Sequence, residues 1–483
     1  MKRRTFIQQA ALASAAMAFS KHGMAGENGS FPTVRIAAGE RKFKSVAVEK
    51  IIADVQKNIG NKEIAWMFEN CFPNTLDTTV DFEMNNGVPD TYVITGDIDA
   101  MWLRDSTAQV WPYLPLCKDD KELQQLIRGV INRQVKNIHL DPYANAFYKD
   151  ASKVSEWKHT DHTDMKPGIH ERKWEIDSLC YPVRLSYGYY KVTGDTSVFN
   201  DQWKEAMKLI VKTFKEQQRF HGQGPYSFQR ETSWATDGVP LSGYGYPVKP
   251  NGLICSMFRP SDDATIFPYL VPSNWFAVIS LEQMARIFTK IAPGDPFIQE
   301  ARQLSNQVQD ALKKYAVAKH PQFGDVIPFE INGFGSYNLM DDANVPSLLS
   351  LPYLLNLEFM EDDFNYLSTN KTLIANTRKF VLSPENPFFF KGKAGEGIGG
   401  PHTGINTIWP LSIIIRGMTS NDDKEIKFCL DMLQKSHGGT GFMHESFDKD
   451  DATKFTRKWF AWANTIFGEF IWKVYRERPH LLK

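Results

Sequence analysis

The sequence has little cysteine, no excess of either charge and, beyond its N-terminus, no apolar run near the ~18 residues of a membrane span. Its five cysteines lie far apart without CxxC spacing, which argues against a disulfide framework. We expect them to be small buried apolar side chains. Lys plus Arg and Asp plus Glu both number 56, and no basic face for nucleic acid is evident. The 11 histidines are scattered, and no HExxH zinc motif is present.

The N-terminus has the three parts of an export signal. Residues 2–4 are basic, residues 6–19 form a short apolar segment, and residues 16–18 read Ala-Met-Ala, a cleavage site of the A-x-A type. The run RRTFIQ also resembles a twin-arginine signal. We therefore expect residues 1–25 to be a signal peptide and the mature protein to be exported to the periplasm. The alternative is an amphipathic first helix.

Helical periodicity dominates the rest of the chain. Apolar side chains recur every three or four positions in residues 121–138, and residues 46–59 behave similarly. The same pattern predicts further helices at residues 103–116, 175–192, 197–220, 273–291, 295–316, 344–356, 363–382, 404–418, 422–437 and 457–476.

Strand signals are few. Residues 79–95 alternate and contain Asn86-Gly87, which predicts a β-hairpin. Residues 222–258 are rich in Gly, Pro, Tyr and Ser and form a connection of the length that often carries function. Paired helices with long loops at one end predict an all-α (α/α)6 barrel with a minor hairpin, in one catalytic domain over residues 40–483. An open α-solenoid is the alternative, although no fixed repeat period is present.

Residues 95–106 place Arg104 beside Asp105, close to Trp102. A planar donor next to a bidentate acceptor suits sugar hydroxyls, because each hydroxyl both donates and accepts a hydrogen bond. The 12 Trp of the chain point mildly in the same direction, since sugar rings stack on aromatic planes. The other interpretation is a helix start that Asp105 or Ser106 caps.

Two further segments carry carboxyl groups in unusual settings. Residues 258–264 place Asp262 and Asp263 side by side after Arg259, where burial and a like-charged neighbour would keep one carboxyl protonated. Residues 438–447 place Glu445 on a loop after a glycine-rich turn, where it is a candidate general base that activates water. The alternatives are a capped turn for the first segment and an ordinary exposed acid for the second.

A protonated and an ionised carboxyl group together suit glycoside hydrolysis. Separated by ~6.5–9.5 Å they invert the configuration, because a water fits between them, whereas at ~5–5.5 Å the second becomes a nucleophile and the configuration is retained. Other polar and aromatic segments either line the same pocket or serve as caps and packing. They are residues 174–178, 340–344, 399–404 and 459–464.

Five ordered blocks of the sequence together resemble glycoside hydrolase family 125, the metal-independent exo-α-1,6-mannosidases. The similarity runs from about residue 64 to residue 472, which is essentially the whole mature chain. The blocks are GDIDAMWLRDSTAQVWPY, FRPSDDATIFPYLVPSNWFAV, YNLMDDANVPSLLSLPYL, GGPHTGINTIWPL and GGTGFMHESF.

The resemblance implies an (α/α)6 barrel and an inverting reaction on non-reducing terminal α-1,6-linked mannose. It places the general acid in the Asp262-Asp263 pair, with Asp262 favoured, and the general base at Glu445. Arg104 and Asp105 would hold mannose hydroxyls. Weaker expectations of substrate contact fall on Trp102, Arg259, His402 and His444.

The resemblance also implies no metal and no cofactor. We expect mannose-containing oligosaccharides as partners, and neither nucleic acid, a membrane span nor an obligate protein partner. Asp97, Asp99, Asp341 and Asp342 lack the spacing of a calcium loop. Three other functions stay open, namely an inactive glycan-binding protein on the same barrel, a helical-barrel glycosidase or lyase for another sugar, and a structural α-solenoid.

Overall fold

The computed structural model describes residues 31–355 and 370–483. The chain divides into two units, residues 1–33 and residues 34–483, and the second contains the elements discussed below. The predicted signal peptide, residues 1–25, lies outside the described residues, as does the first part of the helix predicted at residues 363–382. Export and the predicted domain bounds stay predictions.

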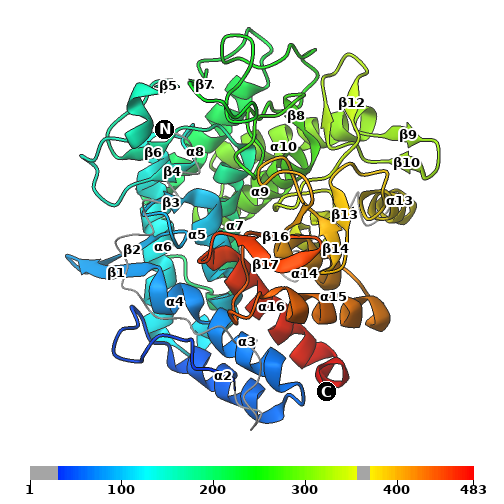
Figure 1. Cartoon of the computed structure of the whole chain (residues 1–483). Helices are drawn as coiled ribbons and strands as arrows, with labels where there is room; N and C mark the ends of the chain where they lie inside the picture. The colour runs from blue at the N-terminus through cyan, green and yellow to red at the C-terminus, as the bar shows by residue number, and fades with distance from the viewer. Residues whose placement is uncertain (1–30, 356–369) are drawn as a thin grey trace. The chain divides into compact units, whose positions relative to one another are not determined.

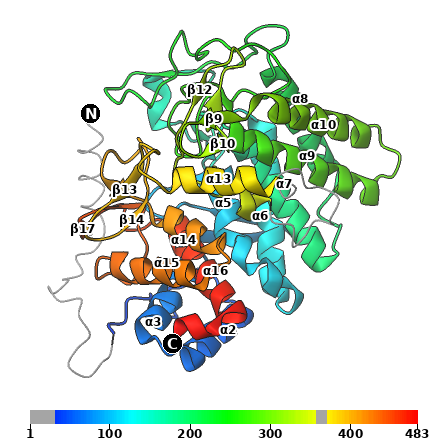
Figure 2. The same cartoon turned by 90° about the vertical axis from the view of Figure 1, so that its right-hand side faces the viewer.

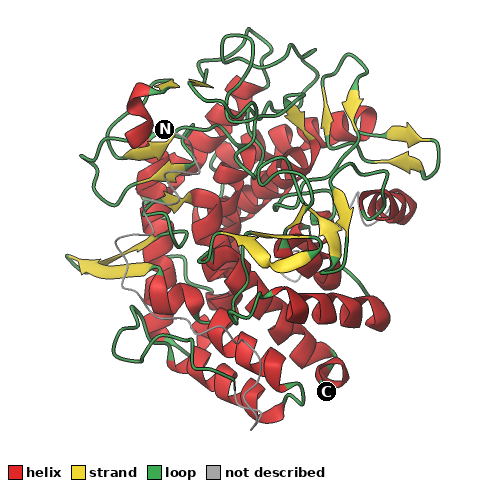
Figure 3. Cartoon of the chain, viewed as in Figure 1, coloured by secondary structure: helices red, strands yellow, loops and turns green. Residues whose placement is uncertain are grey.

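The second unit is built mainly of helices (Figure 3). In the described part of the chain, 3-10 helices accompany the α-helices at Trp111–Lys118 (η1), Glu156–His159 (η2) and Pro479–Leu482 (η3). The α-helices are α2 (Val46–Asn58), α3 (Lys62–Cys71), α4 (Asn74–Thr78), α5 (Leu103–Val110), α6 (Lys121–Leu140), α7 (Ile176–Thr193), α8 (Asp201–Gln217), α9 (Val271–Ile291), α10 (Phe297–Tyr315), α11 (Leu351–Leu354), α13 (Lys371–Val381), α14 (Pro410–Met418), α15 (Asp423–Ser436) and α16 (Ala461–Glu477).

The longer helices fall into two kinds by burial. α7, α9 and α16 are buried over most of their surface, whereas α6, α8, α10 and α15 each bury one face. Contacts between buried helices run in the order α14, α16, α5, α7, α9 and α11. Outer helices pack against this row, as α10 does against α9 and α15 against α14 (Figure 2). The predicted helix-rich fold is therefore confirmed.

Local sequence explains where α6 begins and which face it buries. Asp120 Oδ1 accepts the backbone N–H of Leu123 at 3.0 Å, the usual N-terminal cap. Leu123, Leu126 and Ile127 begin a stripe that is buried along the helix. The helix predicted at residues 121–138 is thus confirmed.

The predicted hairpin is also present. Strands β1 (Val80–Asn85) and β2 (Val88–Val93) pair antiparallel in the register Val80 to Val93. Asn86 and Gly87 both have positive φ, 52° and 81°, as the two-residue turn between twisted strands requires.

The remaining strands form small sheets between the helices (Figure 1). Three of these sheets have three strands, in the orders β3-β4-β6, β12-β11-β8 and β15-β16-β17, and the others are pairs. Their bounds are β3 (Met101–Trp102), β4 (Ala146–Phe147), β5 (Asp161–His162), β6 (Ile169–Glu171), β7 (Gln229–Arg230), β8 (Tyr269–Leu270), β9 (Ala318–His320), β10 (Gly324–Val326), β11 (Glu330–Ile331), β12 (Tyr337–Asn338), β13 (Phe389–Lys391), β14 (Glu396–Ile398), β15 (Thr407–Ile408), β16 (Ser446–Asp448) and β17 (Asp451–Thr456).

Two helix predictions need correction. The helix predicted at residues 344–356 is reduced to the four residues of α11, because Asp341 accepts the backbone N–H groups of Leu348 and Leu349 and holds this segment in turns. The helix predicted at residues 404–418 begins only at Pro410, since β15 occupies the preceding residues. The short helices α3 and α4 were not predicted. Within the described ranges, no helix is both long and apolar enough to cross a bilayer.

Candidate active site

Arg104, at the start of α5, lies among four carboxyl groups, three of which are buried. Its Nη1 donates to Glu175 Oε2 at 2.5 Å and to Asp177 Oδ2 at 3.1 Å, both at the N-terminus of α7. Its Nη2 donates to Asp262 Oδ1 at 3.2 Å, in the loop before α9, and its Nε lies 3.4 Å from Asp105 Oδ2. One guanidinium thus joins three separate parts of the chain.

A single cation does not neutralise four carboxyl groups, so this cluster retains protons. Burial raises the pKa of Asp105 and of Asp177 to about 6 and raises that of Glu175 well above its usual range. Burial also opposes ionisation of Asp262, but the charges of Arg104 and Lys173 and a hydrogen bond from Glu175 hold its pKa below its usual range. Of Glu175 and Asp262, Glu175 is therefore the group that holds the proton.

The backbone holds Asp262 in an unusual conformation, with φ of 66°. Asp is among the residues that enter this left-handed region most readily. Lys173 Nζ donates to the Asp262 carbonyl at 2.8 Å, and Asn145 Nδ2 donates to its Oδ1 at 3.4 Å. The Asp262 side chain stays 21% exposed, so it is accessible to a ligand.

The side chain of Asp263 has different partners from that of Asp262 and is almost fully buried, with 2% of it exposed. Thr236 Oγ1 donates to Asp263 Oδ1 at 2.7 Å, and the Ser261 hydroxyl lies 3.4 Å from Oδ2. His402 Nδ1 lies 3.7 Å from Asp263 Oδ1. Of the two neighbouring acids, Asp262 is therefore the better placed to reach a substrate.

Glu445 reaches the same region from the other end of the sequence. It follows a turn in which Gly438, Gly439 and Gly441 all have positive φ. Its Oε1 lies 3.6 Å from Arg457 Nη1 and 4.0 Å from His402 Nε2. The imidazole of His402 thus lies between Asp263 and Glu445, and the two predicted carboxylate segments face each other across one histidine ring.

Six residues predicted from the sequence meet in this region, namely Arg104, Asp105, Asp262, Asp263, Glu445 and His402.

Trp102 is buried beside His170, with an edge-to-face ring contact at 5.2 Å. Among the described residues no acceptor lies within hydrogen-bonding distance of Trp102 Nε1. An indole N–H without a protein partner suits a sugar hydroxyl, because buried donors are nearly always satisfied.

Two predicted substrate contacts have protein partners in the structure. Arg259 is buried and its Nε donates to Glu330 Oε1 at 2.7 Å, which ties the Asp262 loop to β11. His444 stacks on Phe455 with ring centroids 3.6 Å apart, and burial lowers its pKa to about 4, so the imidazole is neutral. Substrate contact by either residue stays a prediction.

Several residues of the region were not singled out from the sequence. Glu175 and Asp177 stood only among segments that either line a pocket or cap a helix, and Arg457, Lys173 and Asn145 were not considered. For Glu175 and Asp177 the signal was a pair of acids next to Trp174 at the start of an apolar helix. For the others the sequence carries no local signal, because their roles depend on partners far away in the chain.

Within the described ranges, no group of three or more His, Cys, Asp and Glu side chains is arranged to hold a metal ion. The aspartates considered above have other partners. Asp97 Oδ1 accepts from Arg457 Nε at 2.9 Å, and Asp341 accepts the backbone N–H groups of Leu348 and Leu349.

Comparison with known proteins identifies the family to which the chain belongs. Residues 61–472 match the family model described as metal-independent alpha-mannosidase (GH125). A crystal structure of such an enzyme from Streptococcus pneumoniae, in a non-productive complex with α-1,6-mannobiose, is 39% identical, with a TM-score of 0.84 over 90% of this chain and 100% of that one.

A curated relative, the meiotically up-regulated gene 157 protein of Schizosaccharomyces pombe, is 39% identical over 469 residues, which are 94% of this chain and 90% of the yeast protein. The family model and both relatives cover nearly the whole second unit. The chain therefore belongs to the metal-independent α-mannosidases of glycoside hydrolase family 125.

Proposed function

We propose that this α-mannosidase is exo-acting, removes non-reducing terminal α-1,6-linked mannose, and inverts the anomeric configuration. The observation that carries the proposal is the placement of His402 between Asp263 and Glu445, with Asp262 beside Asp263 and nearer the solvent. This arrangement supports the assignment of an acid and a base to opposite sides of a bound sugar. The Streptococcus pneumoniae relative, whose structure contains α-1,6-mannobiose, supports the choice of linkage.

The (α/α)6 barrel is part of the proposal. The contacts that run along α14, α16, α5, α7, α9 and α11 support it, as do the amphipathic helices packed outside this row. The open solenoid has no comparable support, because Arg104, Asp262 and Glu445 come from distant parts of the sequence and meet in one region.

In the proposed reaction the proton held by Glu175 passes to Asp262, which donates it to the glycosidic oxygen while the bond from that oxygen to C1 breaks. The sugar on the other side of the bond departs as an alcohol. Glu445 accepts a proton from a water molecule, whose oxygen forms the new bond to C1 from the opposite face. Arg104 and Asp105 hold the hydroxyls of the mannose. The product is β-mannose, and exchange of one proton with solvent restores both carboxyl groups.

Following the anomer of released mannose by NMR during hydrolysis of α-1,6-mannobiose tests the stereochemistry. We expect β-mannose first, followed by slow mutarotation to the equilibrium mixture. Initial α-mannose would contradict inversion. A panel of aryl glycosides and manno-disaccharides tests the sugar and the linkage.

The variant Glu445→Gln distinguishes the enzyme from a glycan-binding protein on the same fold. We expect it to lose roughly 10²–10⁴-fold in kcat, the usual contribution of a general base, while it still binds mannobiose in a calorimetric titration. Unchanged turnover in this variant would remove Glu445 from the mechanism.

Export to the periplasm belongs to the same proposal. It rests on the basic residues 2–4, the apolar segment 6–19 and the Ala-Met-Ala sequence at residues 16–18.

A further inference from the structure

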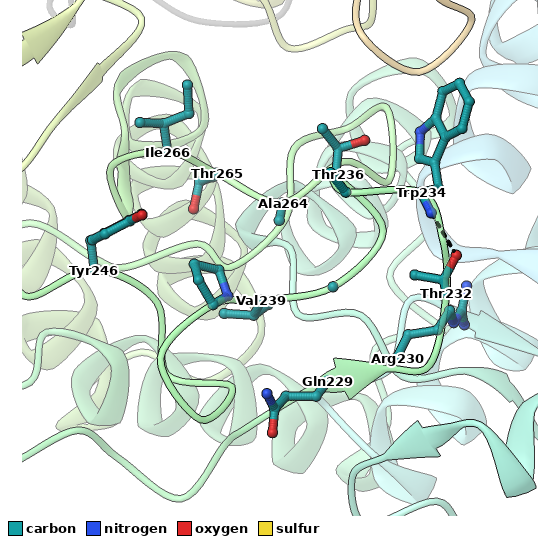
Figure 4. Close-up of a pocket in the computed structure, with 13 residues that line it drawn as sticks. Gln229, Arg230, Thr232, Trp234, Thr236, Val239, Tyr246, Ala264, Thr265 and Ile266 are labelled. Carbon is teal, nitrogen blue, oxygen red and sulfur yellow. Dashed lines mark hydrogen bonds between the residues drawn. The ribbon is translucent and has the colours of Figure 1, made fainter.

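A pocket of about 440 Å³ lies beside the Asp262-Asp263 loop (Figure 4). It is lined by Gln229, Arg230, Thr232, Trp234, Ala235, Thr236, Gly238, Val239, Pro240, Tyr246, Ala264, Thr265 and Ile266. Thr236 forms part of its wall, and the hydroxyl of the same residue donates to Asp263 Oδ1 at 2.7 Å. The backbone N–H of Ala264, another wall residue, donates to the Thr236 carbonyl at 2.7 Å. The wall of the pocket is therefore in direct contact with the loop that carries the proposed acid.

The walls of the pocket offer aromatic surface to solvent. Trp234 is 41% exposed and Tyr246 is 47% exposed, and the two lie on opposite sides of the pocket (Figure 4). The backbone N–H of Trp234 donates to Thr232 Oγ1 at 3.0 Å, which fixes the Trp234 backbone. Exposed aromatic rings around a hollow are typical of binding sites rather than of ordinary surface.

The exposed chemistry of the pocket is neutral. Arg230 is the charged residue of the lining, but its guanidinium is 3% exposed and lies between Asp161, Glu171 and Asp237. The other lining residues are aromatic, aliphatic, Thr, Gln, Gly or Pro. This surface fits an uncharged hexopyranose, whose C–H faces stack on aromatic rings and whose hydroxyls reach Thr and Gln side chains, and it offers no free charge for a phosphate or a carboxylate.

We propose that this pocket binds neutral sugar units of the leaving group, beyond the bond that is cleaved. The inference rests on the proposed function, because a general acid protonates the oxygen of the departing sugar and thus lies on the leaving-group side. The pocket adjoins this acid loop, and Glu445, the proposed base, lies across His402 from Asp263. Substrates with more than two sugars therefore gain contacts with Trp234 and Tyr246.

The test uses α-1,6-linked manno-oligosaccharides of two to five units with wild type, Trp234→Ala and Tyr246→Ala. We expect kcat/KM of the wild type to rise with chain length. Each variant is expected to lose roughly three- to tenfold on the longest substrate, as aromatic contacts are typically worth, and least on the disaccharide. Equal losses at every length, or none, would overturn the proposal.

Tyr337→Ala is the matched control. Tyr337 is 46% exposed, nearly the same as Tyr246, but lies in β12 and outside the pocket. We expect this variant to match wild type at every chain length. A loss equal to that of Tyr246→Ala would also overturn the proposal, because it would show that any exposed tyrosine has this effect.

A binding measurement separates failure of the pocket from failure of the proposed function. Calorimetric titration of Glu445→Gln with the same oligosaccharides is repeated with Trp234→Ala added. Affinity that rises with length and falls in the double variant supports the pocket, even if the wild type hydrolyses none of these sugars. If the wild type hydrolyses these sugars but affinity does not change with their length, the pocket proposal is wrong and the proposed function stands. If there is neither binding nor hydrolysis, both proposals are wrong.

Discussion

Glu175 and Asp262 are carboxyl groups with opposite pKa shifts. Both contact Arg104, but Glu175 is more deeply buried, and the positive charge of Lys173 also acts on Asp262. Burial raises the pKa of Glu175, and the positive charges lower that of Asp262. The pair therefore holds one proton over a wide pH range, and Glu175 keeps it close to the group that must deliver it. Pairs of carboxyl groups with separated pKa values are typical of acid and base assignments in enzymes.

Glu175→Gln is expected to shift the alkaline limb of the pH profile. The general acid must be protonated, so activity falls as pH rises through the pKa of the Glu175–Asp262 pair. Glutamine keeps a donor toward Asp262 but has no proton to lose, so Asp262 must then bind its own proton against the charge of Arg104. We expect the alkaline limb of kcat/KM to move to lower pH by about one unit or more, and the acidic limb to stay in place. Assays between pH 4 and pH 9 measure both limbs.

Ser178→Ala gives the opposite sign. Ser178 Oγ donates to Glu175 Oε2 at 2.8 Å and so stabilises the ionised form. Loss of this hydrogen bond raises the pKa of Glu175 and moves the alkaline limb of kcat/KM to higher pH.

If Glu175→Gln lowered kcat/KM equally at every pH, Glu175 would be a structural residue with no part in holding the proton.

At the level of elements, the packing of buried helices sets the distance between the loops that carry the site. His402 lies in the loop before α14, and Glu445 lies in the turn that leads through β16 and β17 to α16. α14 and α16 pack directly against each other. Gly417 of α14 faces the ring of Phe470 of α16, and a Cβ at position 417 would lie 2.9 Å from Phe470 Cε2. The approach of these helices therefore depends on a residue without a side chain.

Gly417→Ala is expected to destabilise the protein by about 1–3 kcal/mol, the usual cost of overpacking a core. Because α14 would be pushed away from α16, we also expect kcat to fall more than it would for a remote mutation of equal cost. Urea unfolding followed by circular dichroism measures the stability, and hydrolysis of mannobiose measures kcat.

Gly39→Ala is the control for this prediction. A Cβ at Gly39 meets nothing within 4 Å, and its φ is not positive. We expect a change of at most about 0.5 kcal/mol in the free energy of unfolding. Equal stability of the two variants would show that α14 and α16 adjust without cost.

At the scale of the whole molecule, the sequence predicts what depends on neighbouring residues. The stripe of α6, its Asp120 cap and the Asn86-Gly87 turn all follow from local rules, and each is present. Residues 344–350 were wrongly predicted as helix, because the Asp341 carboxylate binds backbone N–H groups that a helix would need. The periodic spacing of apolar residues does not reveal a side chain that competes for backbone N–H groups in this way.

The meeting of the site residues depends on the tertiary fold. The sequence indicated Arg104, Asp262 and Glu445 separately, and the family resemblance joined them, but no spacing predicts that Arg104 touches Asp262 or that His402 lies beside Glu445. Arg457 was missed for the same reason, since its contact with Asp97 joins residues that are 360 positions apart in the sequence. Partners that are distant in sequence leave no periodic or local signal.

A whole-molecule consequence concerns metal ions, because so many buried carboxyl groups would attract a divalent cation unless they were neutralised. Arg104 and the proton of Glu175 offset the first cluster, and Lys173 and Arg230 pair with Glu171 and Asp237 in the next.

We therefore expect dialysis against EDTA to leave both kcat/KM and the melting temperature unchanged, and added calcium to raise neither. An ion that bound the folded protein at a hundred times its Kd would add about 2.7 kcal/mol, which thermal melting would detect. A loss of activity that calcium restored would mean that these carboxylates are less well neutralised than their contacts indicate. In that case the working enzyme would hold a cation among these carboxyl groups, in place of the charge balance that Arg104 and protonated carboxyl groups provide.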